Sequence, residues 1–485
     1  MDPRTPVIVG AAQLTRDAGD DGPIELAAEA LRLAAHDSGA GDALLRKADS
    51  CRHVATLCWP YSDEAALIAA ALGISPRETV RTTPLGGDGP QRLLGDTARS
   101  IAAGEIELAL VTGAEALAAL RGLQQAGAKP DWPAQPSGQA PTRTVGTDRF
   151  PSNEAEAAVG LLAPVYNYAL LESAVRARKG SDRATHALEI ATLWSRFSKV
   201  AAANPHARIR REFDPGELLA ATPDNRPVSL PYLKRLTANI QVDQATALIL
   251  CSAEAAAASG VPRDRWVFVH ASAFASDEWF MSERAELAAS PAIDAAGRAA
   301  LEHAGRTIDE IAYIDLYSCF PSAVQIAAAE FGVASTDDRP LTLTGGLTFA
   351  GGPGNNYASH SVVTAVGKLR DDPDAFALTT ALGWYVTKHA VGIYSGRAPE
   401  RPFAEIEADP LIDRPQPRRA TAAYEGEATI EAFTVPYNRD GAPEAAVISA
   451  LTPDGERALV RSTEAGLIDA LVTGDPLGDT ITFPI

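Results

Sequence analysis

A glycine-dense stretch from Leu341 to Val366, LTLTGGLTFAGGPGNNYASHSVVTAV, limits the possible folds of this chain more than any other segment. Its first residues, Leu341 to Leu343, are apolar and β-branched and predict a strand, and apolar residues at helical spacing follow the glycines. The predicted unit is therefore a strand, a loop and a helix. Such a loop brings bare backbone N–H groups to a helix N-terminus, where negative charge is stabilised. The glycines are Gly345, Gly346, Gly351, Gly352 and Gly354.

A tight packing turn without a ligand is the alternative interpretation of this stretch. The density of glycines and the polar residues that follow them favour a functional loop. These polar residues are Asn355, Asn356, Tyr357 and His360.

Length and charge limit the class of protein. The 485 residues exceed what one hydrophobic core supports, so about two to four domains are expected. The 43 Lys and Arg residues are outnumbered by 62 Asp and Glu residues, and the net charge is −19. Because an acidic surface repels phosphate backbones, nucleic acid is not expected as a partner; a local basic groove for a phosphorylated ligand stays possible.

Neither an export signal nor a membrane span is expected. Met1 to Leu14 has no apolar core of signal-peptide length, and no run approaches the roughly 20 apolar residues that cross a bilayer. The four cysteines lack the spacing of a metal site or a disulfide framework. We therefore expect a cytoplasmic protein with buried thiols, no metal and no permanently bound cofactor. The cysteines are Cys51, Cys58, Cys251 and Cys319.

The first part of the chain alternates predicted strands and helices. Val7 to Gly10 predicts a buried strand and Ile24 to Ser38 a helix. Val80 to Ala116 then predicts a glycine-rich turn, a helix that Gly104 ends, and a second strand from Leu108 to Val111. The buried stripe of that helix is expected at Leu94, Ala98 and Ile101.

A later part of the chain follows the same plan. Ile311 to Leu316 predicts a strand, Pro321 opens a helix, and the glycine-dense unit follows. Residue-level identity between the two parts is weak, but their common order suggests an internal structural repeat.

An insertion and an appendage complete the organisation. Residues 121–149 predict a loop and 155–203 mostly helix, which we interpret as a cap over the site. After about Pro399, short strand-like runs with hairpin signals at Asp440-Gly441 and Asp454-Gly455 predict a small β-rich domain that needs docking onto its neighbour. The expected boundaries are 1–120 (first half), 121–240 (cap), 241–262 (return strand and helix of the first half), 263–400 (second half) and 401–485 (β-rich domain).

Four motifs, in this order, resemble the thiolase superfamily, near the sterol-carrier-protein-type thiolases. The resemblance covers roughly Thr5 to Ser395, and the β-rich appendage resembles the extra C-terminal domain of the thiolase-like protein type 1 group. The motifs are IAAGEIELALVTGAEA (Ile101–Ala116), VDQATALILCSAEAA (Val242–Ala256), YSCF (Tyr317–Phe320) and GGLTFAGGPGNNYAS (Gly345–Ser359).

The resemblance implies an α/β thiolase fold of five layers, α-β-α-β-α, built from two similar halves with a helical loop domain. It also implies a coenzyme A thioester as substrate or ligand. A homodimer is possible by the same resemblance, and a monomer is an open alternative.

The catalytic positions of a thiolase are changed in this sequence. Alignment on Ile101 and Gly104 places Gly87 where the family has its nucleophilic cysteine. Tyr317 stands at the histidine of the HDCF-type motif, Gly352 at the activating histidine of GHP, and Ala381 near the late acid/base cysteine. Because Gly87 has no sulfur, the two-step mechanism through a cysteine thioester is excluded at that position.

Cys319 is the first candidate for a replacement catalytic group. It lies two residues before Pro321, at a predicted strand-to-helix junction, where a helix N-terminus lowers a thiol pKa and favours the thiolate. The alternative is a buried cysteine that acts as a small apolar side chain.

Two histidines and several neutral groups are further candidates. His360 and His389 suit general acid/base chemistry, although a lone histidine often has a structural role. Tyr317 is a candidate hydrogen-bond donor to a thioester oxygen. Substrate contacts are expected from the glycine-rich loops and their asparagines, one of which alternatively caps the helix that begins at Tyr357. The expected binding residues are Gly87, Gly351, Gly352, Asn355 and Asn356.

Three functional hypotheses follow. The first is an acyl-CoA-processing enzyme of lipid metabolism, an acetyl-CoA acetyltransferase-like acyltransferase or a catalyst of C–C bond chemistry with a rebuilt site. The second is a degenerate member that binds acyl-CoA or lipid without converting it. The third is a non-catalytic subunit whose β-rich domain docks onto a partner. The retained motifs around Gly345 to His360 favour the first hypothesis.

Overall fold

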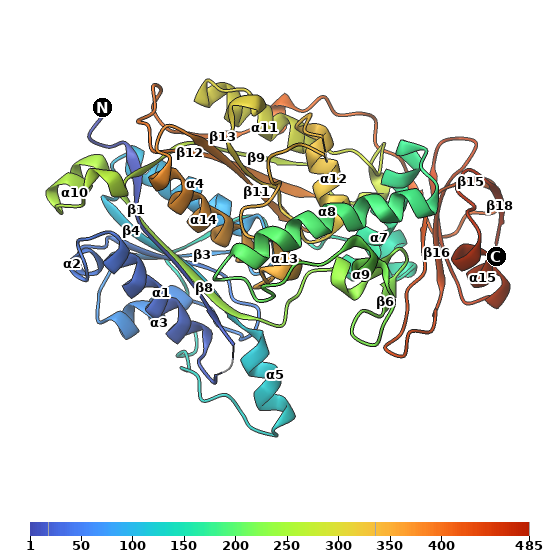
Figure 1. The fold of residues 1–485 in the computed structure, drawn as a ribbon, viewed down its shortest axis with the longest axis horizontal. Coiled ribbons are helices and arrows are strands. Elements are labelled where there is room, and N and C mark those ends of the chain that lie inside the picture. The colour runs from blue at the N-terminus through green and yellow to red at the C-terminus, as the bar shows by residue number, and fades with distance from the viewer. Residues whose placement is uncertain (18, 335, 485) are drawn as a thin grey trace.

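The computed structural model describes residues 1–17, 19–334 and 336–484, and Figure 1 shows their arrangement. Its main sheet runs in the order β10-β11-β12-β9-β1-β8-β4-β2-β3-β5 and has two halves. The halves meet where β1 pairs with β9 through Val7 with Phe268 and Ile8 with Val267. The strands of the first half are β1 (Pro6–Arg16), β2 (Ser50–Val54), β3 (Glu78–Thr82), β4 (Leu108–Ala116) and β8 (Asp243–Ser252). Those of the second half are β9 (Val267–Ser276), β10 (Tyr313–Asp315), β11 (Phe376–Gly383), β12 (Lys388–Ser395) and β13 (Ala404–Glu407).

The predicted internal repeat is present in the strand order. The first half has the order β3-β2-β4-β8-β1, and the second has β10-β11-β12-β9, which is the same order without the strand equivalent to β3. A strand at Leu341 to Leu343 would be the equivalent of β3 in the second half. The structure has no strand at these residues, so this prediction was wrong. The backbone N–H of Leu343 donates instead to Asp315 Oδ2 at 2.7 Å, so a buried carboxylate takes the place of a ladder partner.

Helices form three layers around the two sheet halves (Figure 1). The central helices α4 (Gly89–Ala102) and α14 (Tyr357–Asp371) contact strands of both halves. On the outer faces, α1 (Pro23–Asp37) and α3 (Glu64–Leu72) cover the first half, and α11 (Pro291–Ala304) and α12 (Pro321–Glu330) cover the second. This is the expected five-layer α-β-α-β-α thiolase fold. The predicted stripes of the central helices share one buried cluster, which contains Leu94, Ala98, Ile101, Val362, Val366 and Leu369.

The insertion between the halves is mainly helical, as predicted. Its long helices are α7 (Pro164–Lys179) and α8 (Arg183–Ala203), and α5 (Leu117–Gln125), α6 (Glu154–Ala158) and α9 (Pro215–Leu219) are shorter. Within the predicted loop, β5 (Arg143–Val145) pairs with β3, so the edge of the first half is occupied by a segment of the same chain.

The C-terminal region folds as a separate small sheet, at the right of Figure 1. Its strands have the order β14-β17-β16-β15-β18, and α15 (Ala465–Thr473) packs on them. The predicted hairpin at Asp454-Gly455 joins β16 to β17, and Gly455 has a φ of 81°. The strands are β14 (Ala420–Thr421), β15 (Gly426–Thr434), β16 (Ala446–Leu451), β17 (Arg457–Ser462) and β18 (Thr480–Phe483).

Polar contacts dock this small sheet onto the rest of the molecule. The Leu230 N–H donates to the Val435 carbonyl at 2.9 Å, and the Phe433 N–H donates to Ser173 Oγ at 3.1 Å. Arg457, whose side chain is fully buried, donates to the carbonyl oxygens of Ser282 and Arg284 at 2.7 and 2.6 Å. The predicted need for docking is therefore met by buried hydrogen bonds at several points.

Candidate functional site

Position 87 has no room for a side chain. Gly87 lies just before α4, and a Cβ built on it would collide with the hydroxyl of Tyr317 and lie 2.5 Å from the Leu382 carbonyl oxygen. A real Cβ essentially never comes within 3.0 Å of such atoms. The hydroxyl of Tyr317 therefore occupies the space where a side chain at position 87 would begin.

Tyr317 is buried beside this glycine. Its backbone N–H donates to Thr380 Oγ1 at 2.8 Å, and its ring packs edge-on against Tyr357, with 5.4 Å between ring centroids. Burial raises the pKa of the Tyr317 hydroxyl well above its usual value, so the group stays neutral and is a hydrogen-bond donor. Tyr317, Ala381 and His389 line one small cavity of about 20 Å³, which has room for about one water molecule.

The pKa predicted for Cys319 was wrong. The residue precedes α12, as expected, but its side chain is buried among apolar residues. Burial raises the pKa of the Cys319 thiol to about 12, and the hydrogen bond with Tyr168 only partly offsets this. The helix N-terminus does not compensate for the lost hydration of a thiolate, so the reactive form is disfavoured.

His360 also differs from the expected acid/base group. Its Nδ1 lies 2.9 Å from Gln13 Oε1 on β1, and Nε2 has no hydrogen-bond partner among the described residues. Burial, with a smaller contribution from nearby His206, lowers the pKa of His360 to about 3. The ring is thus neutral at physiological pH, and its recorded contacts are with the first half rather than with Tyr317.

His389 is the predicted histidine that shares a cavity with Tyr317. On its other side, Nε2 lies 3.0 Å from Asp277 Oδ2 and 3.3 Å from Ser290 Oγ. Both partners approach the same ring nitrogen, and Ser290 also accepts the Ile293 N–H at the start of α11. This arrangement of serine, aspartate and histidine therefore anchors a helix start and is not a nucleophilic relay, in which the two partners bind opposite nitrogens.

The glycine-rich loop is held by its asparagines. Asn355 Oδ1 accepts the N–H of Gly86 at 2.9 Å, which joins this loop to the one that contains Gly87. Asn356 stands at the N-cap of α14, but its side chain makes no capping bond and donates instead to Gly113 O and Thr246 Oγ1, both at 2.9 Å. The structure therefore brings the two predicted glycine-rich loops together.

The glycines of the loop differ in whether their surroundings leave room for a side chain. Gly351 has a φ of 120°, and the side-chain amide of Gln244 packs where its Cβ would be. A Cβ at Gly352 would lie 3.4 Å from the nearest atom, the Asn239 carbonyl oxygen, which is ordinary contact. Packing therefore leaves room for a side chain at position 352, in contrast to position 87.

Sequence reasoning missed an ion pair beside Gly87. Lys388 Nζ lies 3.0 Å from Asp88 Oδ1, and both side chains are 2% exposed. Asp88 also lies 3.3 Å from Arg92, so its carboxylate faces two cations. Only the position of Asp88 directly after Gly87 pointed to this pair, because its partner is 300 residues away along the chain.

The turn between β11 and β12 holds strained backbone. Trp384 and Val386 have φ values of 61° and 57°, which non-glycine residues rarely adopt. The hydroxyl of Tyr168 donates to the Trp384 carbonyl at 2.7 Å and accepts the Val386 N–H at 3.3 Å. Such strain persists where the surroundings fix it and often occurs at functional sites.

The fold and this site together define a thiolase-fold protein in which position 87 has no room for a side chain. A solved structure described as a monomeric SCP2-thiolase-like protein type 1 from Mycobacterium smegmatis is 36% identical, with a TM-score of 0.85, over 99% of this chain and 97% of that one. A family model for the thiolase-like protein type 1 additional C-terminal domain matches residues 409–483. The chain therefore belongs to the SCP2-thiolase-like protein type 1 family.

More distant structures share the fold alone. The Ltp2–ChsH2(DUF35) aldolase is 17% identical, with a TM-score of 0.63, over 82% of this chain and 99% of that one. The dimeric peroxisomal thiolase of Saccharomyces cerevisiae is 15% identical, with a TM-score of 0.58, over 81% and 98%. No sequence among curated proteins matches the chain.

Within residues 1–17, 19–334 and 336–484, no helix is long and apolar enough to cross a membrane. In the same residues, no three His, Cys, Asp or Glu side chains gather in a way that could hold a metal ion.

Proposed function

We propose that this protein binds a coenzyme A thioester without forming a covalent acyl-enzyme. The thioester would lie at the Gly351–Asn356 loop, and the phosphates of coenzyme A would lie on a neighbouring basic cluster. We define the basic cluster as Arg208, Arg210, Arg211, Lys234 and Arg235. The observation that carries the proposal is the attachment of this cluster to the glycine-rich loop in a chain whose net charge is −19.

Backbone hydrogen bonds connect the basic cluster to the loop. The Arg208 N–H donates to the Ala350 carbonyl at 3.0 Å, and the Ile209 N–H donates to the Phe349 carbonyl at 2.8 Å. Gly351 directly follows Ala350 in the chain, so the backbone that carries Arg208 is bonded to the segment just before these glycines. Guanidinium groups bind phosphate through paired, charge-assisted hydrogen bonds.

Two side chains of the cluster lie over one aromatic ring. The guanidinium carbons of Arg211 and Arg235 lie 4.2 and 5.1 Å from the centroid of Phe213, whose ring stacks on Phe349. Arg210 is exposed, and its recorded hydrogen bond is to the Pro205 carbonyl at 3.5 Å. Within the cluster, Arg208 pairs with Asp17 and Arg211 pairs with Glu217. The other positive charges of the cluster are those of Arg210, Lys234 and Arg235, and the first two of these side chains are exposed.

The sulfur chemistry of the site supports non-covalent binding. Position 87 has neither a sulfur atom nor space for one, and the thiol of Cys319 is held in its protonated form by burial. Mass spectrometry after incubation with acetyl-CoA is expected to show no acetylated cysteine. An adduct on Cys319 would contradict this part of the proposal.

Calorimetric titration with coenzyme A tests the basic cluster. We expect the double variant Arg210→Ala/Arg211→Ala to bind coenzyme A about tenfold or more weakly, because each lost charge-assisted hydrogen bond is worth about 1.5 kcal/mol or more. Pantetheine, which lacks the phosphates, should bind the variant and the unaltered protein equally.

The matched control is Arg298→Ala, which removes an exposed arginine from α11 on the far half. This variant should bind coenzyme A as the unaltered protein does. Equal affinity of the double variant and the control, or no binding of coenzyme A at millimolar concentration, would refute the proposal.

The position of Tyr317 favours a second candidate function, the aldol-type cleavage of a 3-hydroxyacyl-CoA. In this reaction the C2–C3 bond breaks, the hydroxyl proton leaves to a base, and the resulting enolate carbon takes up a proton. A neutral tyrosine hydroxyl at the place of the thiolase nucleophile would donate a hydrogen bond to the enolate oxygen of the thioester. The Ltp2–ChsH2(DUF35) structure, which shares the fold, is described as an aldolase.

Tyr317→Phe tests this candidate by removing one oxygen atom. Chromatography should detect a shorter acyl-CoA and a carbonyl product with the unaltered protein, and the variant should be roughly 10²-fold slower with unchanged coenzyme A affinity. Tyr394→Phe, which removes a buried hydroxyl bonded to Gln91, is the control and should keep its rate. Absence of product with the unaltered protein over a range of chain lengths would leave the binding function alone.

A further inference from the structure

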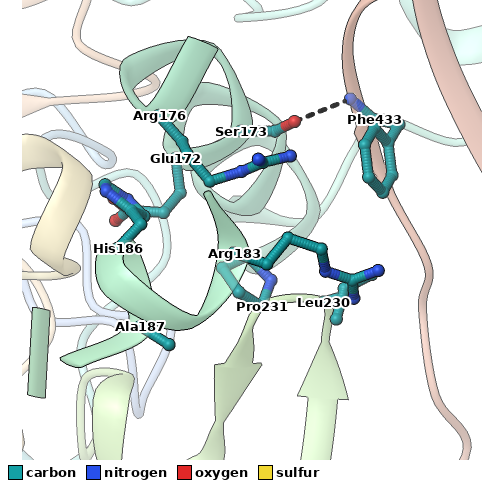
Figure 2. A pocket seen from close by; sticks show the side chains of 9 residues that line it. All are labelled: Glu172, Ser173, Arg176, Arg183, His186, Ala187, Leu230, Pro231 and Phe433. Atoms are coloured by element: carbon teal, nitrogen blue, oxygen red, sulfur yellow. Dashed lines mark hydrogen bonds and ion pairs between the residues drawn. The ribbon is translucent and has the colours of Figure 1, made fainter. Parts of the chain in front are cut away.

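A cavity of about 170 Å³ lies where the insertion meets the C-terminal sheet (Figure 2). Helix α7 contributes Glu172, Ser173 and Arg176, and α8 contributes Arg183, His186 and Ala187. Leu230 and Pro231 follow β6 (Pro227–Ser229), and Phe433 comes from β15. The cavity lies outside the site at Gly87, and three parts of the chain that are distant in sequence build it.

Arg183 contributes positive charge to the cavity, and the carboxylate of nearby Asp475 offsets part of this charge. Arg183 Nη1 donates to the carbonyl oxygens of Leu471, at 3.1 Å, and Gly474, near the end of α15. Among the described residues, Arg183 forms no ion pair within 4.0 Å, whereas neighbouring Arg176 is bound by Asp475 through two hydrogen bonds. In Figure 2, both guanidinium groups extend towards the strand that contains Phe433.

His186 adds a buried polar atom without a partner. Its Nε2 lies 2.6 Å from Glu172 Oε1, an oxygen that also accepts a hydrogen bond from Gln325. Its Nδ1 has no hydrogen-bond partner among the described residues and lies 3.7 Å from Glu189 Oε2. Because the His186 side chain is 2% exposed, this atom is shielded from bulk water, and it faces Glu189, which is not one of the residues that line the cavity.

The rest of the cavity suits a short apolar group. Ala187, Leu230, Pro231 and Phe433 form apolar walls. Ser173 Oγ accepts the Phe433 N–H, and its own hydroxyl proton has no recorded acceptor among the described residues, so it is a second donor next to the guanidinium groups. A dry cavity of about 150 Å³ holds a ring the size of benzene, so one of about 170 Å³ matches a small aromatic or branched acid.

From this geometry we infer a second ligand site, which binds a small monocarboxylate with a compact apolar group. The carboxylate is bound by Arg183 and Ser173, the polar edge of the ligand faces His186, and the apolar group packs against Leu230, Pro231 and Phe433. The carboxylates of Glu172 and Asp475 accept hydrogen bonds from other side chains, so neither occupies the position of the ligand carboxylate beside Arg183. This site is independent of the proposed coenzyme A site.

Titration of the full-length protein with benzoate, followed by calorimetry and by the melting temperature, tests the site. We expect saturable binding with a Kd near or below 1 mM and a rise in melting temperature, as a ligand of this size allows. Benzamide, which has the same shape without the charge, should bind at least tenfold more weakly. Inorganic phosphate, which has charge without an apolar group, should also bind at least tenfold more weakly.

Two variants locate the binding. Arg183→Gln removes the charge, and Ala187→Phe fills the cavity; each should weaken benzoate binding at least tenfold and leave the affinity for coenzyme A unchanged. Arg178→Gln, on the exposed side of α7, and Ala184→Phe, on the exposed start of α8, are the matched controls and should bind benzoate normally. If Ala187→Phe fails to fold, Arg183→Gln decides alone.

Three results would overturn the inference. They are no saturation with benzoate up to 20 mM, equal affinity for benzoate and benzamide, and unchanged benzoate affinity in Arg183→Gln. Loss of benzoate binding together with normal coenzyme A binding supports this site whatever the fate of the proposed function.

Discussion

Replacing Arg457 with alanine is expected to lower the free energy of unfolding by about 3–5 kcal/mol. The guanidinium is 0% exposed, binds Glu431 within the small sheet, and donates to the carbonyls of Ser282 and Arg284 in the second half. The substitution leaves a largely buried carboxylate and two buried carbonyl oxygens without their donor, and burying such groups unpaired is costly.

Urea unfolding followed by tryptophan fluorescence measures this loss. Because Arg457 connects the small sheet to the thiolase halves, limited proteolysis should also release the C-terminal region earlier in Arg457→Ala. The control is Arg419→Ala, which removes an 80%-exposed arginine whose ion pair with Glu456 should contribute less than about 1 kcal/mol. Equal stability of the two variants would mean that Arg457 does not anchor the sheet.

His360→Asn is expected to make the protein less sensitive to acid. In the folded state burial lowers the pKa of His360 to about 3, while an unfolded histidine has a pKa near 6.5. The unfolded chain therefore binds the proton first, and stability falls as the pH drops below about 6.5 until about pH 3. Between pH 7 and pH 5 this one group removes about 2 kcal/mol from the free energy of unfolding.

Other buried groups titrate in the same range, so the variant must be compared with the unaltered protein at each pH. Burial lowers the pKa values of His53 and His270 to about 4, which adds to the acid sensitivity. Burial raises the pKa values of Glu115 to about 7 and Asp315 to about 6, and protonation of these carboxyls stabilises the folded state as the pH falls. The difference between variant and unaltered protein isolates His360.

Urea unfolding at pH 7 and pH 5 provides the measurement. The stability lost between the two pH values should be about 2 kcal/mol smaller in His360→Asn, because asparagine keeps a polar group near Gln13 without binding a proton. His36→Asn, at an exposed position in α1, controls for the removal of a histidine as such. The same pH dependence in both variants would show that His360 is not the buried neutral group described here.

The core helices and the glycine-rich loops could be predicted from the sequence because their signals are local. Pro90 and Gly104 mark the ends of α4, and Leu94, Ala98 and Ile101 repeat at helical spacing along it. The small C-terminal sheet was likewise indicated by Asp454-Gly455, since a turn of that type needs a residue with positive φ. Each of these features depends on residues within a few positions of one another.

The site chemistry depended on contacts that the sequence does not contain. The helix position of Cys319 predicted a thiolate, but the residue is buried beside Tyr168 of α7, and desolvation outweighs the helix terminus. Leu341 to Leu343 had the composition of a strand, but the backbone N–H of Leu343 donates a hydrogen bond to the carboxylate of Asp315 and not to a neighbouring strand. In both cases a distant side chain decided a local outcome.

The sequence by itself determined that position 87 has no nucleophile and that two glycine-rich loops belong to one repeated α/β plan. Residue identity and spacing are enough for both statements. Only the tertiary structure decided that Tyr317 fills the space where a side chain at position 87 would begin, that Lys388 pairs with Asp88, and that a cavity opens beside Arg183. These features arise where segments far apart in the chain pack together, and the free energy of burying charge and polar groups there depends on all of those segments at once.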